Sequence, residues 1–146
     1  MHATQPPTPD STDTPTVPPV TALRLAADYL DQHGWIQGDY YVPWDAEHPP
    51  ACTLGALAIA CYGQPIADPF DDGTEDGRHI VDLDHVNRWH DFMTVHHALI
   101  AYLNLGRARL DFSVDTWNDT TGRSATEVTT TLRAAADHYA ERLVRP

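Results

Sequence analysis

Apolar residues recur with helical spacing near the start of the chain, over residues 21–33. One face of this segment carries Leu23, Ala27 and Leu30. Thr21 is of a residue type that caps helix N-termini, and Gly34 stands where a helix-ending glycine is expected. We therefore predict a helix from Thr21 to His33, with Trp35 folding back onto Leu30 just after its end.

A second helical pattern begins at Thr53 and ends before Gly63. Its apolar stripe consists of Leu54, Leu57, Ala58 and Cys61. Several glycine and alanine residues make this helix thin, so neighbouring elements can approach it closely and we place it centrally. Cys52 and Leu57 have the spacing of a hydrophobic staple at the N-terminus of the helix, with Cys52 at the N′ position.

A third and longer pattern covers residues 83–105 and stops at Gly106. Its predicted apolar face consists of Val86, Trp89, Met93, His96, Ile100 and Leu103. Asp82 or Asp84 can cap this helix. Asp91 or Thr94 could begin a second helix, so the pattern fits one helix or two.

The sharpest local signal is a capping box formed by Ser124 and Glu127. The apolar stripe behind it consists of Val128, Leu132, Ala135, Tyr139 and Leu143. This pattern predicts a last helix that begins directly after Ser124.

The remaining segments are predicted to be loops that connect the helices. Glycine and proline break residues 36–51 and 64–81, and weak alternation at Leu110, Phe112 and Val114 predicts one short extended segment in 107–117. We expect an all-α fold, a bundle of four to five helices with long loops. The predicted core contains Trp35, Leu57, Trp89, Val128 and Leu132. Three loop aromatics are predicted to cover this core rather than to form a ligand surface: Tyr40, Tyr41 and Trp44.

Residues 1–20 are rich in proline and threonine and have few apolar side chains to bury. We predict a disordered tail over 1–20 and one helical domain over 21–146. The tail lacks the basic start and apolar run of a secretion signal, and no segment is apolar for long enough to cross a bilayer. The expected location is therefore cytoplasmic, with no membrane partner.

The formal net charge is −12, and all nine basic residues other than histidine are arginine. The absence of lysine excludes a P-loop, a Schiff base and a catalytic lysine. An acidic surface repels phosphates, which argues against direct nucleic-acid binding and suits a basic protein partner. The helical rise over the nine steps from Cys52 to Cys61 places their Cα atoms too far apart for a disulfide, so both thiols are expected to be free.

Three motifs follow one another in a characteristic order: His33-Gly34-Trp35 with Gln37-Gly38, Cys52-Thr53-Leu54-Gly55-Ala56-Leu57, and Trp117-Asn118-Asp119 followed by Gly122-Arg123-Ser124 and Glu127-Val128. In this order and spacing the chain resembles a small actinobacterial and actinophage family, domain of unknown function 6197, from about Leu23 to Ala136. The resemblance implies a compact helical domain and brings no activity, substrate or catalytic residue.

The nine histidines do not show the spacing of a metal site. Helical ligand pairs lie three or four residues apart, whereas His85 and His90 are five apart and His96 and His97 are adjacent. The acidic run at 71–77 lacks the pattern of a calcium loop. Asp82 and His85 do have the right spacing, and we expect them to start a helix instead. We therefore predict no metal and no cofactor.

Cys52 offers the main catalytic alternative. A helix N-terminus can stabilise a thiolate, His90, His96 or His97 could serve as its base, and Asn118 or Asp119 could orient that base. This set defines a small thiol hydrolase using Cys52, His96 and Asn118. The competing interpretation makes Cys52 a buried packing residue.

Trp117, Asn118 and Asp119 can either anchor a loop or form polar contacts in a binding site together with Trp35. No catalytic set is complete, so the leading expectation is a non-catalytic protein-binding or regulatory domain. The resemblance places that role in phage–host or defence biology. A third hypothesis is an acidic nucleic-acid mimic that inhibits a DNA-binding protein.

Overall fold

The computed structural model describes residues 16–75, 79–80, 82–107 and 112–144. Within these ranges the chain is mainly α-helical, as predicted, with five helices and one two-stranded pairing. The elements are α1 (Pro19–His33), α2 (Thr53–Tyr62), β1 (Thr74–Glu75), β2 (His79–Ile80), α3 (Leu83–Leu103), α4 (Val114–Asn118) and α5 (Ala125–Val144). β1 and β2 pair antiparallel. Most of the predicted tail, residues 1–15, lies outside the described residues.

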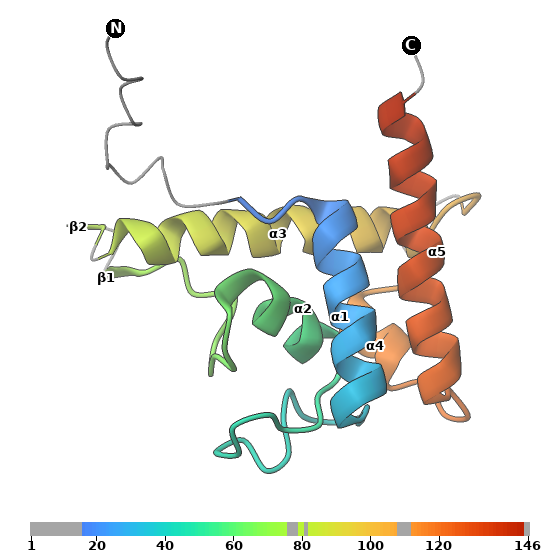
Figure 1. Cartoon of the computed structure of the whole chain (residues 1–146), viewed down its shortest axis with the longest axis horizontal. Coiled ribbons are helices and arrows are strands. Elements are labelled where there is room, and N and C mark those ends of the chain that lie inside the picture. The colour runs from blue at the N-terminus through green and yellow to red at the C-terminus, as the bar shows by residue number, and fades with distance from the viewer. Residues whose placement is uncertain (1–15, 76–78, 81, 108–111, 145–146) are drawn as a thin grey trace, which may run out of the picture.

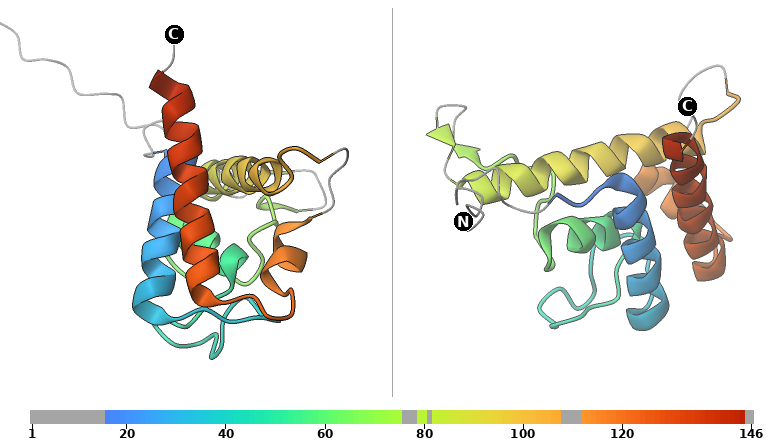
Figure 2. Two further views of the ribbon diagram at one scale, coloured as in Figure 1. Left: turned by 90° about the vertical axis from the view of Figure 1, so that its right-hand side faces the viewer. Right: turned by 45° about the horizontal axis from the view of Figure 1, so that its top comes forward.

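Helices α1 and α5 run side by side in opposite directions, with α3 crossing behind them (Figures 1 and 2). Their facing apolar side chains, including Leu23, Leu30 and Leu132, are buried. Exposed ion pairs join the rims of the two helices: Arg133 with Asp28 and Asp31 at 2.8 and 2.7 Å, and Arg24 with Asp137 at 3.0 Å. Such exposed pairs contribute little to stability, so burial holds this helix pair together.

The start of α1 differs from the prediction. The helix begins at Pro19, with Pro18 rather than Thr21 at the N-cap position. Proline is suited to the first turn because no helical partner is available for the missing N–H. The preceding residue is also held in place, since the backbone N–H of Val17 donates to Asp91 at 3.0 Å. The end of α1 is as predicted, and the N–H of Gly34 donates to Leu30 O.

Helix α2 occupies the centre of the fold, as its small residues predicted, and is buried on almost every side. Gly55 permits the closest approach. A Cβ atom at this position would lie 2.5 Å from the carbonyl oxygen of Tyr40 and 2.9 Å from the ring of Tyr41. The backbone of the 36–51 loop therefore passes directly against the first turn of α2.

Helix α3 is a single helix, and Asp82 caps it by accepting a hydrogen bond from the N–H of Asp84. Its most buried residues are Phe92, Val95 and Leu99, none of which belongs to the predicted face. The predicted residues Trp89, Met93 and Ile100 are partly buried at the edge of the core. The face was misassigned because apolar residues surround much of this helix, and only its tertiary neighbours decide which line is innermost.

The predicted extended segment before Trp117 is wrong where the structure describes it. Val114 begins helix α4, and the side chain of Ser113 caps that helix by accepting from the N–H of Thr116. Leu110 lies outside the described residues. The apolar spacing of Phe112 and Val114 thus spans a helix cap, which periodicity alone cannot distinguish from a strand.

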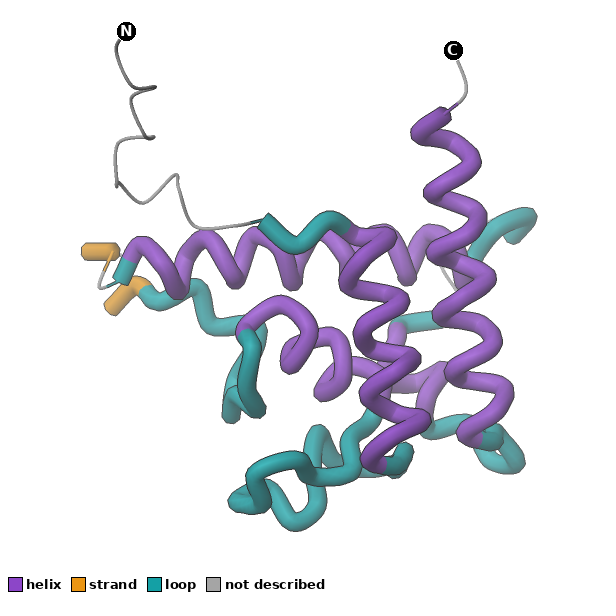
Figure 3. Tube along the Cα trace, viewed as in Figure 1, coloured by secondary structure: helices purple, strands orange, loops and turns teal. Residues whose placement is uncertain are grey.

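The capping box of α5 is confirmed in both directions. The N–H of Ser124 donates to Glu127 at 3.0 Å, and the N–H of Glu127 donates to Ser124 Oγ at 3.1 Å. The predicted stripe is buried at Val128, Leu132 and Ala135, but Leu143 is 77% exposed. The C-terminal turns of α5 extend beyond α3 (Figure 3), so no element covers them there.

Three of the five residues predicted to form the core are fully buried: Leu57, Val128 and Leu132. Trp35 and Trp89 instead lie at its edge, partly exposed. Their indole N–H groups explain this position, because each donates to a polar acceptor: Trp35 to Asn118 and Trp89 to the carbonyl of Phe70.

Candidate functional site

The side chain of Asn118 joins three segments that are distant in sequence. Its Oδ1 accepts hydrogen bonds from the indole of Trp35 at 2.7 Å and from the backbone N–H and hydroxyl of Thr53 at 2.9 and 2.6 Å. Its Nδ2 donates to the carbonyl oxygen of Ile36 at 3.1 Å and to Asp119 at 2.9 Å. Asn118 is 1% exposed, so the structure brings it together with Trp35 as an internal connection.

The neighbours of Asn118 extend this connection. Asp119 Oδ1 accepts from the backbone N–H of Gly38 at 3.0 Å. Trp117 is buried, and the guanidinium of Arg123 lies 4.7 Å from the centre of its ring. Gln37 donates to the carbonyl oxygens of Asn118 and Thr120. The residues predicted to form a binding site thus fasten α4 to the segment after α1 and to the start of α2.

Cys52 is the N-cap of α2, so the predicted staple, which placed it one residue further out, is wrong. Its Sγ accepts from the N–H of Gly55 at 3.4 Å. Burial raises the pKa of this thiol to about 11, although the hydrogen bonds from Gly55 and Leu54 act in the opposite direction. At this thiol, desolvation thus outweighs the backbone donors that the helix N-terminus supplies.

A cavity of about 510 Å³ nevertheless brings the whole proposed thiol set together. Cys52, His96, Asn118 and Asp119 all line it. Within the described residues, no hydrogen bond links Cys52 to His96, and Asn118 is already fully engaged. The Nδ1 atom of His96 is buried and has no hydrogen-bond partner in the described part of the chain, and burial lowers the pKa of its ring. We call this space the smaller cavity.

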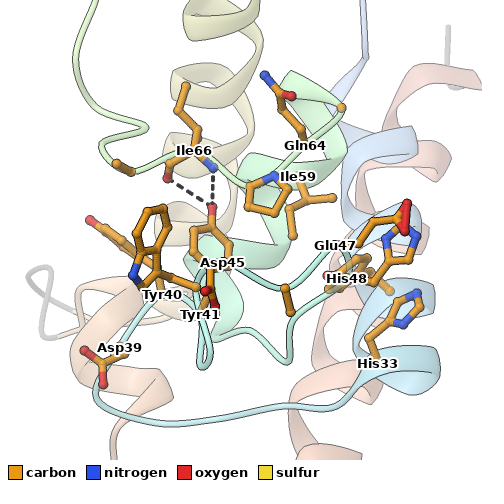
Figure 4. A pocket seen from close by; sticks show the side chains of 16 residues that line it. His33, Asp39, Tyr40, Tyr41, Asp45, Glu47, His48, Ile59, Gln64 and Ile66 are labelled. Atoms are coloured by element: carbon orange, nitrogen blue, oxygen red, sulfur yellow. Dashed lines mark hydrogen bonds between the residues drawn. The ribbon is translucent and has the colours of Figure 1, made fainter.

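A second cavity, of about 980 Å³, lies between the 39–48 loop and the 63–67 loop (Figure 4). Tyr41 forms part of its wall, and its hydroxyl both donates to the carbonyl and accepts from the N–H of Ile66. Trp44, predicted to cover the core, is instead 73% exposed at this cavity. We call this space the larger cavity.

Histidines form one end of the larger cavity. The rings of His33 and His48 stack with centroids 4.9 Å apart, and the ring of Tyr29 lies 4.6 Å from that of His33. Tyr29 is fixed by donating to the carbonyl of Pro49 at 2.7 Å. Figure 4 shows Glu47 beside this pair of histidines, with Asp39 at the opposite end of the cavity.

The acidic side chains of the larger cavity have no arginine among the described residues that line it. Asp39, Asp45 and Glu47 line it, and within the described ranges none of them has a hydrogen-bond or ion-pair partner. The ion pairs of the described arginines are formed elsewhere, on α1, α3 and α5 and in the turn before α5. Within the described residues, the carboxylates of the larger cavity therefore have no arginine partner.

The part of the chain that the structure describes contains no group of three or more histidine, cysteine, aspartate or glutamate residues that could hold a metal ion. Asp82 caps α3, while the ring of His85 lies 2.8 Å from the carbonyl oxygen of Asp71. Among the described helices none is long and apolar enough to span a bilayer.

A family model described as a family of unknown function (DUF6197) matches residues 14–138. The chain belongs to this family. The matched range includes both cavities and the Asn118 connection. No curated protein and no solved structure matches this DUF6197 chain.

No site was predicted at Asp39, Asp45, Glu47 or His48 of this DUF6197 chain, and His33 was predicted only as a helix end and a motif residue. A signal was present, because the run from Asp39 to Glu47 mixes aromatic and acidic residues within a loop that has no helical or strand period. This mixed composition is visible in the sequence itself. The second wall of the larger cavity, residues 63–67, could not be inferred from that run.

Proposed function

We propose that this DUF6197 chain is a non-catalytic binding protein whose larger cavity receives a basic segment of a partner protein. The observation that supports the proposal is the combination of three carboxylates without partners in the described structure and an exposed tryptophan. An arginine or lysine side chain can pair with a carboxylate while it lies over an aromatic ring. Exposed tryptophan is also typical of residues that dominate protein interfaces.

The charge of the whole chain supports the same partner chemistry. A net charge of −12 attracts basic proteins over a range set by ionic strength, about 8 Å at physiological salt. The carboxylates of the larger cavity would then fix the position of individual cationic side chains. A DNA-binding protein is one kind of basic partner that this proposal includes. Inhibition of such a protein would be a regulatory role in phage–host or defence biology.

The test is calorimetric titration of the full chain with a short, end-blocked peptide that carries two arginines among apolar residues. A matched peptide with citrulline in place of arginine keeps the shape and removes the charge. We expect the arginine peptide to bind, the citrulline peptide to bind much more weakly, and the affinity to fall as salt is raised. Equal binding of both peptides would refute charge recognition.

Variants locate the binding. Asp45→Asn and Glu47→Gln should each weaken the arginine peptide about two- to fivefold, the range for partly exposed ion pairs. Glu141→Gln is the matched control, since it removes the same charge from an exposed residue on α5. Trp44→Phe should abolish any change in tryptophan fluorescence on binding. If Glu141→Gln weakens binding as much as Asp45→Asn, the larger cavity is not the site.

A second candidate function is the thiol hydrolase, which the shared position of Cys52, His96 and Asn118 around the smaller cavity favours. Its chemistry requires an ionised thiol and a base in hydrogen-bond reach. The raised pKa of Cys52 and the engagement of Asn118 make it the weaker proposal.

A further inference from the structure

The smaller cavity differs in composition from the larger one. Leu54, Phe70 and Ile100 give it apolar walls, and carboxylates from Asp39, Asp115 and Asp119 face the same space. Arginine is absent from its described lining. A volume of about 510 Å³ falls in the range of small-molecule sites, which are mostly apolar with a few polar groups that set orientation.

The aromatic part of this wall is held in a fixed arrangement. The ring of His96 stacks on Phe92 at 6.0 Å with an interplanar angle of 5°, and it meets Phe70 edge to face at 5.0 Å. Since Nδ1 of His96 is buried, Nε2 is the polar ring atom that this residue can offer to a ligand. The wall is thus preformed and can accept a flat apolar group without rearrangement.

The carboxylates of the smaller cavity are not equivalent. Asp119 is committed to the N–H of Gly38 and to Asn118. The side chain of Asp115 has no hydrogen-bond or ion-pair partner among the described residues, and its charge acts on both Tyr40 and His96. Asp115 therefore supplies a negative charge at the mouth of an apolar space, with nothing positive from the described chain to balance it.

We infer that the smaller cavity is a binding site for a small organic cation, an amine or guanidine carried on a compact apolar or aromatic body. The body would lie against Leu54, Phe70 and Ile100, and the cationic group would pair with Asp115. A carboxylate ligand would be repelled by the three acidic residues, and a purely apolar ligand would leave Asp115 unpaired. This inference concerns a different cavity and does not depend on the proposed function.

The probes are three molecules of nearly equal size: benzylamine, benzyl alcohol and benzoate. Fragments of this size bind in the millimolar range, so each is titrated to about 20 mM into the full chain. NMR signals of the Ile100 methyl groups and the His96 ring report on the smaller cavity, and the indole signal of Trp44 reports on the larger one. We expect benzylamine to shift the first two signals saturably, benzyl alcohol to bind at least about fivefold more weakly, and benzoate to have no effect.

Two variants check the position of the cation. Asp115→Asn should weaken benzylamine about two- to fivefold, whereas Asp45→Asn, at the larger cavity, should leave its affinity unchanged. The comparison of the three probes on the native chain keeps the test valid if Asp115→Asn unfolds. Equal binding of benzylamine and benzyl alcohol, a benzylamine shift confined to Trp44, or no saturable shift of Ile100 would overturn the inference. Loss of peptide binding at the larger cavity would bear on the proposed function alone.

Discussion

Replacing the buried residue Asn118 by alanine should cause a large loss of folding stability, because buried hydrogen-bond donors depend on its side chain. Asn118 Oδ1 is the acceptor for the N–H and hydroxyl of Thr53 and for the indole of Trp35. Thr53 is fully buried, so in Asn118→Ala its two donors lose their acceptor and cannot reach water. Trp35 is partly exposed and can recover a hydrogen bond to solvent.

The size of the effect follows from the number of buried donors that are left unpaired. Each such donor costs about 1–3 kcal/mol, and the Thr53 hydroxyl can reduce its share by rotating, so the total is about 2–4 kcal/mol. Urea denaturation followed by far-UV circular dichroism measures it. With a denaturant slope of about 1.5–2 kcal/mol per M, the midpoint should fall by about 1–2.5 M.

A double-mutant cycle with Thr53→Val tests the cause of this loss. In the native chain Thr53→Val removes one hydrogen bond and should destabilise by about 0.5–1.5 kcal/mol. In the Asn118→Ala background the same change removes an unpaired hydroxyl and should be neutral or stabilising. A loss below about 1 kcal/mol for Asn118→Ala, or additive effects in the cycle, would refute the reasoning.

Two further predictions concern the first turn of α2. With a pKa of about 11, Cys52 has a thiolate fraction at pH 7 about 300-fold lower than a free thiol of pKa ~8.5. Alkylation of Cys52 by iodoacetamide, followed by mass spectrometry, should be slower than that of the free thiol by at least that factor, and its rate should rise about tenfold per pH unit. Rapid modification with an inflection below pH 8.5 would favour the thiol hydrolase instead. Gly55→Ala should lower stability by about 1–3 kcal/mol in thermal or urea unfolding, because the new methyl group meets the Tyr40 carbonyl oxygen at 2.5 Å. Gain of stability, the usual result of Gly→Ala within a helix, would show that the loop is not held against α2.

The ends of α1 and α2 and the start of α5 could be predicted because the responsible interactions are local. Gly34 and Gly63 end α1 and α2, and the capping box begins α5, each within four residues of the sequence. The inner face of α3 could not be predicted in the same way. Phe92 and Met93 are both apolar, and only the packing of α1 and α2 against the helix decides that Phe92 is the buried one.

The candidate sites were predictable only in part. The motifs offered a contact between Trp35 and Asn118 as one of two alternatives, and the hydrogen bonds show a connection between segments that no spacing could reveal. The larger cavity needed knowledge of two loops that are distant in sequence and have no periodicity. The smaller cavity combines residues from three helices and from the segments that connect them, so single residues could be proposed from the sequence but their common position around one cavity could not.

Asp39 and Tyr40 line both cavities, so one short backbone segment contributes to the wall of each. That segment is pressed against Gly55 and tied by its neighbour Gly38 to Asp119. An occupant that moved this segment would change the shape and the potential of both spaces at once. Thermodynamic linkage then requires the effect to be reciprocal. If a ligand in one cavity changes the affinity of the other cavity by some factor, a ligand in the other cavity changes the affinity of the first by the same factor. If both proposed sites bind their ligands, this shared segment would make the two binding events depend on each other.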